Sequence, residues 1–169
     1  ALAIAALCAG AATAQAQVNP AATDPNASAT VVVTGTRVAN RTALDTAAPV
    51  DIISSETLKN AGSTEMNQAL SLALPSLNFP RPSITDGTDT IRPATLRGMA
   101  PDQTLVLVNS KRRHASSLVN VNGSIGRGSA AVDLNTIPTA IVKSVEVLRD
   151  GAAAQYGSDA ISGVVNMRL

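Results

Sequence analysis

Aromatic side chains are almost absent from this 169-residue chain, which has one Phe, one Tyr and no Trp. Proteins that bind single-stranded nucleic acid stack bases on aromatic rings, so this class is poorly supported. Membrane-spanning barrels carry aromatic girdles, so we do not expect these residues to encode one. An excess of charge is also missing, because 13 basic residues face 12 acidic ones. This balance excludes a strongly basic nucleic-acid binder and an acidic disordered tail.

Residues that build catalytic and metal sites are equally scarce. His114 is the only histidine, and it follows three basic residues on what we expect to be a solvated strand end. A catalytic histidine needs a nucleophile and an orienting group within reach, and the sequence indicates neither. Residues 123–129 have the glycine spacing of a phosphate-binding loop, but Ser129 stands in place of its Lys. We therefore expect no catalytic residue, no metal and no cofactor, and the chain is not predicted to be an enzyme.

The N-terminal stretch lacks charge, because the first charged residue is Asp24. Residues 1–16 are Ala-rich, and they are too short and too weakly apolar for a membrane-spanning helix of ~20 residues. They are typical of the end of a secretion signal, with small residues at possible cleavage sites at 12–14 or 14–16. Cleavage would remove Cys8, the only cysteine. A disordered Ala-rich leader is the alternative.

The rest of the chain divides into a tail and a compact domain. Residues 17–48 are rich in Ala, Pro, Asn, Ser and Thr and predict a flexible tail. Within the tail, residues 30–37 form a short β-prone run. The compact domain is expected to cover residues 49–169.

The compact domain begins with a predicted strand over residues 50–53, followed by two short helices. Ser54 or Ser55 can cap the first helix. Residue 63 or 64 can cap the second, which should end before Pro75. Helical spacing predicts that this second helix turns four residues toward the core: Met66, Ala69, Leu70 and Ala73.

The remainder predicts strands that are separated by long loops. Residues 77–90 and 115–131 read as loops. In the strand over residues 142–148, Val145 and Val147 should point to one side and Glu146 to the other. Further strands are expected at 95–97, 104–108, 111–114 and 163–167, with a turn at 109–110 and a short helix at 152–156. The predicted class is α+β, with a small mixed β-sheet.

Six segments follow one another along the chain. They are VVVTGTR at 31–37, PVDII at 49–53 with the helix pair behind it, LRG at 96–98, LVLVNSKR at 105–112, IP with VEVLRDG at 137–151, and residues 152–166, which end in AISGVVN. The segments lie behind an export signal and follow the order found in the N-terminal plug domain of TonB-dependent outer-membrane receptors, which this chain therefore resembles. Asn109-Ser110 replaces the family's Asp-Gly, and Asp150 is inserted before Gly151. Both are turn changes that preserve the resemblance.

The resemblance implies a plug that fills a 22-stranded barrel, which this chain does not include. It also implies that residues 30–37 are a TonB box, which adds as a strand to TonB while ExbB/ExbD supply the energy. The TonB-binding residues would be Val31, Val32, Val33, Thr34 and Gly35. The alternative is that residues 31–33 form an edge strand of the domain itself.

Further roles follow from the resemblance alone. Arg97, Glu146 and Arg149 would contact the barrel, unless the two arginines are only solvated strand ends. The ligand, a small molecule or metal chelate, would meet loop residues that include Phe79, Arg81, Asn120, Asn122, Arg127 and Tyr156. The sequence leaves siderophore, cobalamin, haem and carbohydrate open.

The resemblance thus implies gating of energy-dependent nutrient uptake at the outer membrane. Two alternatives involve no transport: a stand-alone periplasmic interaction module and a non-functional truncated receptor. A small exported enzyme that uses His114 is a third.

Overall fold

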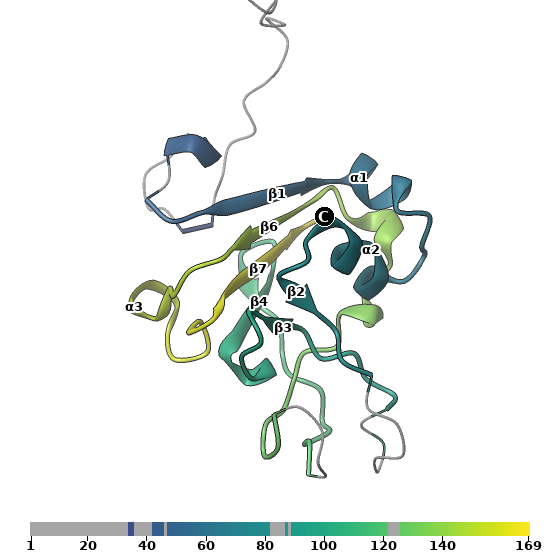
Figure 1. Cartoon of the computed structure of the whole chain (residues 1–169), viewed down its shortest axis with the longest axis vertical. Coiled ribbons are helices and arrows are strands. Elements are labelled where there is room, and N and C mark those ends of the chain that lie inside the picture. Colours follow the sequence, from purple (N-terminus) through teal and green to yellow (C-terminus); the bar gives the residue numbers. More distant parts are fainter. Residues whose placement is uncertain (1–33, 36–41, 46, 82–86, 88, 122–125) are drawn as a thin grey trace, which may run out of the picture.

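A five-stranded mixed sheet forms the centre of the domain (Figure 1). The computed structural model describes residues 34–35, 42–45, 47–81, 87, 89–121 and 126–169. The sheet has the order β1-β6-β7-β4-β5, in which only β4 and β7 run parallel. Its strands are β1 (Val50–Ser54), β4 (Thr104–Val108), β5 (Lys111–Arg112), β6 (Ser144–Leu148) and β7 (Gly163–Arg168).

A second, two-stranded sheet pairs β2 (Leu77–Asn78) with β3 (Thr95–Leu96). The prediction of one loop over residues 77–90 is therefore wrong at its start. The partner strand lies beyond that loop, so local sequence does not signal the pairing. The wider prediction of an α+β domain with a small mixed sheet is confirmed.

Two short helices follow β1, as predicted. The Ser54 Oγ accepts a hydrogen bond from the Thr57 backbone N–H at 3.2 Å and caps α1 (Ser55–Asn60). The second helix, α2 (Met66–Ala73), ends before Pro75 as expected. Its predicted cap is wrong, because Glu65 is the N-cap and makes no side-chain cap bond. The described residues also form α3 (Ala153–Tyr156) and four 3-10 turns: η1 (Ala43–Asp45), η2 (Pro101–Gln103), η3 (Leu134–Thr136) and η4 (Thr139–Ile141).

The two faces of the five-stranded sheet carry different cores. Alternation along β6 turns Val145 and Val147 to one face, where α1, α2 and the small sheet cover them. All four predicted core positions of α2 lie in or against this cluster: Met66, Ala69, Leu70 and Ala73. The opposite face holds a smaller apolar cluster built from Val50, Leu105, Leu107, Leu148, Ala152, Ala160 and Val164.

Two backbone features fix how the strands meet. Asn109 and Ser110 have φ values of 48° and 64°, which close the predicted β4–β5 hairpin. Gly163 has a φ of 147°, and a Cβ there would lie 2.2 Å from the Leu148 carbonyl oxygen. Only glycine therefore lets β7 begin this close to the end of β6.

Candidate functional site

The strand register places a polar pair in the middle of the smaller core. Glu146 lies opposite Asn166 across β6 and β7, and each residue is 1% exposed. Ile52 on β1 and Leu107 on β4 flank the pair in the same row across the sheet. A buried carboxylate in an apolar setting is costly unless hydrogen bonds satisfy it. The Glu146 carboxylate therefore requires hydrogen-bond partners on the face of the sheet to which it points.

Thr34 supplies those partners from the N-terminal region. Its backbone N–H donates to Glu146 Oε2 at 2.9 Å, and its Oγ1 hydroxyl donates to the same oxygen at 2.5 Å. The Asn166 side-chain amide in turn donates to Thr34 Oγ1 at 3.0 Å. Arg168 Nη1 lies 3.6 Å from the other carboxylate oxygen. Thr34 is itself only 1% exposed, so these bonds are shielded from water.

Gly35 extends the contact to α3. Its backbone N–H donates to the Tyr156 hydroxyl at 3.0 Å. Its φ of 79° is a left-handed conformation, and a Cβ would lie 3.2 Å from Leu148 Cδ1. Glycine thus allows the backbone to turn while it lies close to the sheet. We call Thr34–Gly35 the strap.

The strap is the described part of the segment predicted to bind TonB. Val31, Val32 and Val33 lie outside the described residues. Glu146, predicted to contact a barrel, lies beneath the strap in this structure. Its barrel contact stays a prediction.

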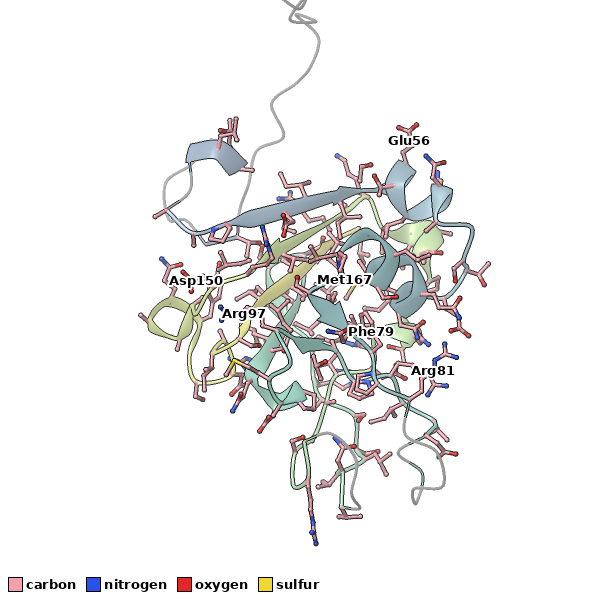
Figure 2. All side chains as sticks on the ribbon, viewed as in Figure 1. Glu56, Phe79, Arg81, Arg97, Asp150 and Met167 are labelled. Atoms are coloured by element: carbon pink, nitrogen blue, oxygen red, sulfur yellow. The ribbon has the colours of Figure 1, made fainter. Side chains whose placement is uncertain are left out.

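The two predicted barrel-contacting arginines lie in different surroundings. Arg149 forms an ion pair with Asp51 on β1, in which Nη2 lies 3.3 Å from Oδ1. Arg97 is exposed and has a φ of 57°, and its backbone N–H donates to the Ser76 carbonyl oxygen at 2.9 Å. Figure 2 shows the Arg97 side chain on the ribbon. Both barrel contacts stay predictions.

The predicted ligand-loop residues do not form one cluster. Phe79 packs against the larger core, whereas Arg81 lies at the periphery and pairs with Glu65 at 2.9 Å (Figure 2). Asn120 is buried and donates to the Ser129 hydroxyl at 3.4 Å. Arg127 is exposed and Tyr156 contacts the strap, while Asn122 lies outside the described residues.

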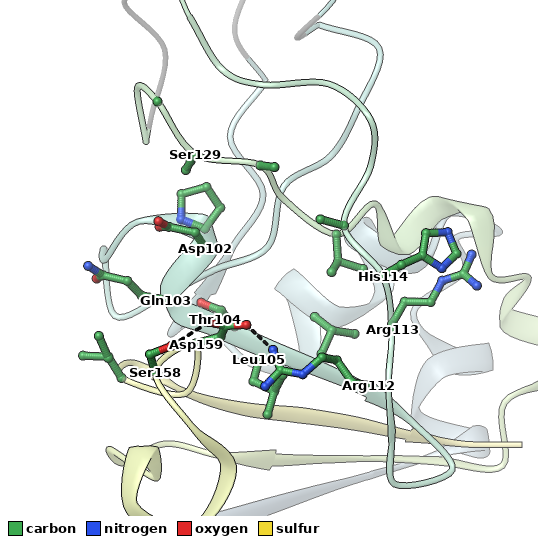
Figure 3. A pocket seen from close by; sticks show the side chains of 17 residues that line it. Asp102, Gln103, Thr104, Leu105, Arg112, Arg113, His114, Ser129, Ser158 and Asp159 are labelled. Atoms are coloured by element: carbon green, nitrogen blue, oxygen red, sulfur yellow. Dashed lines mark hydrogen bonds and ion pairs between the residues drawn. The ribbon is translucent and has the colours of Figure 1, made fainter.

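A cavity of about 530 Å³ opens beside β4 and β5 (Figure 3). Arg112 and Asp159 form an ion pair at its wall, and the Arg112 guanidinium also donates to the Tyr156 carbonyl oxygen at 3.1 Å. Arg113, His114 and Asp102 line other parts of the cavity. Charges of both signs therefore meet there.

The described part of the chain contains no group of three or more His, Cys, Asp or Glu residues that could hold a metal ion. None of the helices seen in that part is both long and apolar enough to cross a membrane.

Sequence reasoning missed two residues that hold the strap in place. The sequence predicts no role for Asn166 and a ligand contact for Tyr156. A polar residue inside a run of apolar strand residues was the available signal, since VEV and VVNM each contain one. The contact between Glu146 and Thr34 could not be predicted, because the two residues lie 112 positions apart along the chain.

Comparison with known proteins gives one consistent result. Residues 42–164 match the family described as the TonB-dependent Receptor Plug Domain. The ferric enterobactin receptor of Pseudomonas aeruginosa is 34% identical over 119 residues, which is 70% of this chain and 16% of that protein. The probable TonB-dependent siderophore receptor PirA of Acinetobacter baumannii is 38% identical over 94 residues, which is 56% of this chain and 12% of that protein.

Solved structures give the same result. A mutant of the Pseudomonas aeruginosa ferric enterobactin receptor in complex with enterobactin matches with a TM-score of 0.54 and 31% identity. The match covers 72% of this chain and 17% of that one. The siderophore receptor PirA of Acinetobacter baumannii matches with a TM-score of 0.51 and 30% identity, over 70% of this chain and 17% of that one. This chain thus spans less than a fifth of the length of these relatives.

Proposed function

This chain belongs to the family of TonB-dependent receptor plug domains, and from that premise we propose that it gates energy-dependent uptake of a nutrient across the outer membrane. The observation that carries the proposal is the family match over residues 42–164, together with a sheet and helices that superpose on solved siderophore receptors. Gating by a plug requires a surrounding barrel, a ligand and a source of work. Each of these is a separate part of the proposal.

The source of work is TonB, which binds residues 30–37 by strand addition. Backbone N–H and C=O groups supply the affinity in this mode of recognition, so the side chains need only favour an extended chain. The run of three valines in VVVTGTR suits that demand. ExbB/ExbD would energise TonB, and the work would reach the domain through the chain that follows the strap.

The ligand is a ferric siderophore. Four relatives that match this chain are named as siderophore or ferric enterobactin receptors, which supports this class over cobalamin, haem and carbohydrate. Arg127 and Arg81 are cationic and exposed, and Arg81 is paired with Glu65 at the surface, so both are suited to an anionic chelate. Arg97 and Arg149 would pair with carboxylates of the barrel wall, because arginines enclosed by a barrel would need such partners.

The proposed docking of TonB is tested with Val32→Pro. Proline removes a backbone donor from the middle of the strip and cannot sit in a paired strand without loss. We expect binding to the C-terminal domain of TonB to weaken at least tenfold, as measured by calorimetry on the full chain. Val18→Pro is the matched control, since it makes the same change outside residues 30–37.

Equal affinity of the Val32→Pro variant and the unchanged chain would refute docking at this strip. Equal loss in both proline variants would show that TonB does not distinguish the strip from the preceding segment. Either result would remove the proposed source of work and leave only the family and the fold.

A further inference from the structure

We propose that Ser129 and Asn120 are positioning residues, which hold a tight turn at residues 126–129 and so present Arg127 to an anionic ligand. This inference deepens the proposed function, because it rests on an anionic siderophore as the ligand. It also changes the role of Asn120, which the sequence predicts to contact the ligand and which the structure places inside the loop.

Burial along the loop shows that Asn120 does not face the solvent. Asn120 is 1% exposed, whereas Val119 and Val121 on either side of it are 46% and 53% exposed. The polar side chain therefore points inward and the two valines point outward, which is the reverse of the usual order. A buried amide costs free energy unless it is hydrogen-bonded, so the bonds that Asn120 makes inside the loop explain its position.

Asn120 and Ser129 join the two arms of the loop. The backbone N–H of Asn120 donates to the Ser129 carbonyl oxygen at 2.9 Å, and the Asn120 carbonyl oxygen accepts from the Gly128 N–H at 2.6 Å. The side-chain amide of Asn120 donates to the Ser129 hydroxyl at 3.4 Å. Val119 and Ala130 form an antiparallel bridge beside these bonds. The two arms are therefore fixed to each other next to the turn.

Ser129 also closes the turn that carries Arg127. Its backbone N–H donates to the Gly126 carbonyl oxygen at 2.9 Å, and its hydroxyl donates to the same oxygen at 2.5 Å. Gly128 has a φ of 87°, which is the conformation that the third residue of a type II turn requires. Arg127 is thus the second residue of a four-residue turn, and it is exposed.

Gly126 brings this turn close to Pro101 at the start of η2. A Cβ at Gly126 would lie 2.4 Å from Pro101 Cδ and 2.6 Å from Ser129 Oγ, so only glycine allows this approach. Pro101 is buried, and β4 begins directly after η2. The place of the turn is therefore set relative to the central sheet.

The cavity beside β4 and β5 extends along the inner side of this loop. Gly128, Ser129 and Ala130 are among the residues that line it (Figure 3). Residues that face a cavity have fewer packed neighbours, so dispersion contributes less to the shape of the loop on this side. The hydrogen bonds of Ser129 and Asn120 therefore carry more of the task of holding the turn.

The turn gives Arg127 a defined place from which to bind an anion. An arginine on a loose loop loses backbone freedom when it binds, and this loss weakens the affinity. The backbone of Arg127 is already fixed by the turn, so this cost is met before the ligand arrives. A siderophore with negative charge would then meet a guanidinium whose attachment point does not have to be ordered.

The first measurement is amide hydrogen exchange of Gly128 and Ser129 in the full chain. Ser129→Ala removes the hydroxyl bond to Gly126 and the acceptor of the Asn120 amide, so it should raise exchange about tenfold. Asn120→Ala removes the longer bond of 3.4 Å and should raise exchange about threefold. Ser117→Ala is the matched control, because it removes a hydroxyl at an exposed position in the same loop. Exchange in β4 and β7 reports whether each variant keeps its fold.

The second measurement relates the turn to ligand binding, with ferric enterobactin as the probe and a receptor that carries this plug. Arg127→Met should weaken binding about tenfold, the effect of one lost hydrogen bond from a charged group. In the Ser129→Ala background the same change should weaken binding only about threefold, because a loose turn no longer places the guanidinium. Lys111→Met is the control, since it removes an exposed cation from β5 and should leave binding unchanged.

The outcomes separate the role of the turn from the proposed function. Unchanged exchange in both Ser129→Ala and Asn120→Ala would overturn the positioning role. A tenfold loss on Arg127→Met in both backgrounds would also overturn it, because Arg127 would then act independently of the turn. Failure of the unchanged receptor to bind ferric enterobactin would overturn the proposed ligand, while raised exchange in the same two variants would still show that Ser129 and Asn120 hold the turn.

Discussion

The two faces of the central sheet are covered in opposite ways. Helices α1 and α2 and the small sheet cover one face with close apolar packing, in which Leu58, Leu70 and Leu77 are at most 1% exposed. The other face is covered in its centre by the strap, which is held by hydrogen bonds to Glu146 and Asn166. Apolar packing is cooperative and hard to undo locally, whereas a short polar contact can open alone.

Because of this difference, one face should determine the stability of the whole domain, and the other should determine how readily the strap opens. Loss of a side chain on the helix-covered face should weaken the whole domain, because the cavity left behind is shared by β6, β7 and both helices. Loss of a bond on the strap-covered face should open the strap and leave the strands paired. Substitutions on the two faces therefore test whether the domain divides in this way.

The largest effect is expected from Leu70→Ala on the helix-covered face. Leu70 is 0% exposed, and truncation of such a leucine costs about 2–5 kcal/mol of unfolding free energy. Urea unfolding measures the loss. Leu72→Ala, two residues along the same helix at 69% exposed, is the control and should change stability by less than about 0.5 kcal/mol. Equal losses in the two variants would contradict the assignment of this face as the stabilising core.

Local sequence predicted the inward-facing helix and strand positions of the helix-covered face. Helical spacing identified Met66, Ala69 and Leu70, and alternation identified Val145 and Val147, because both patterns follow directly from backbone geometry. The caps were harder to predict. Ser54 was among the predicted caps and fits the structure, but Glu65 occupies a cap position for which Ser63 and its neighbour are better suited chemically.

The strap-covered face could be predicted only in part. Alternation along residues 142–148 assigned Glu146 to the side opposite Val145, which the structure confirms. The contacts of Glu146 could not be predicted. Its contact with Asn166 depends on the register of β6 and β7, and its contact with Thr34 depends on the path of the N-terminal region. On the helix-covered face, β2 was missed for the same reason, since its partner lies beyond the following loop. Contacts between distant residues leave no periodic signal in the sequence.

An intermediate effect, confined to the strap, is expected from Glu146→Leu. Leucine would continue the apolar row formed by Ile52 and Leu107, and replacement of a buried charge by a well-packed apolar residue is often neutral or stabilising. We expect the unfolding free energy to change by less than about 1 kcal/mol. The rate of amide hydrogen exchange in the strap (strap exchange) should nevertheless rise about tenfold or more, because both hydrogen bonds from Thr34 to the carboxylate are lost.

Parallel measurements of unfolding and exchange decide this case. A fall of about 3–5 kcal/mol in unfolding free energy would mean that Glu146 supports the whole domain, and the distinction between the two faces would fail. Lys59→Leu serves as the control, since it replaces an exposed charge on α1, which covers the other face of the sheet. It should leave strap exchange unchanged.

The smallest effect is expected at the edge of the sheet, where Asp51 pairs with Arg149. The two side chains are 32% and 39% exposed, and ion pairs near the surface contribute about 0–1 kcal/mol. Asp51→Asn should therefore lower the unfolding free energy by less than about 1 kcal/mol and leave strap exchange unchanged. Glu65→Gln, which breaks the similarly exposed ion pair with Arg81, should have the same small effect.

Arg149→Met would separate two roles for this arginine. If Arg149 serves only Asp51, its loss should match that of Asp51→Asn within about 0.5 kcal/mol and leave uptake intact in a receptor that carries this plug. If Arg149 also pairs with a barrel carboxylate, uptake should fall in Arg149→Met and persist in Asp51→Asn.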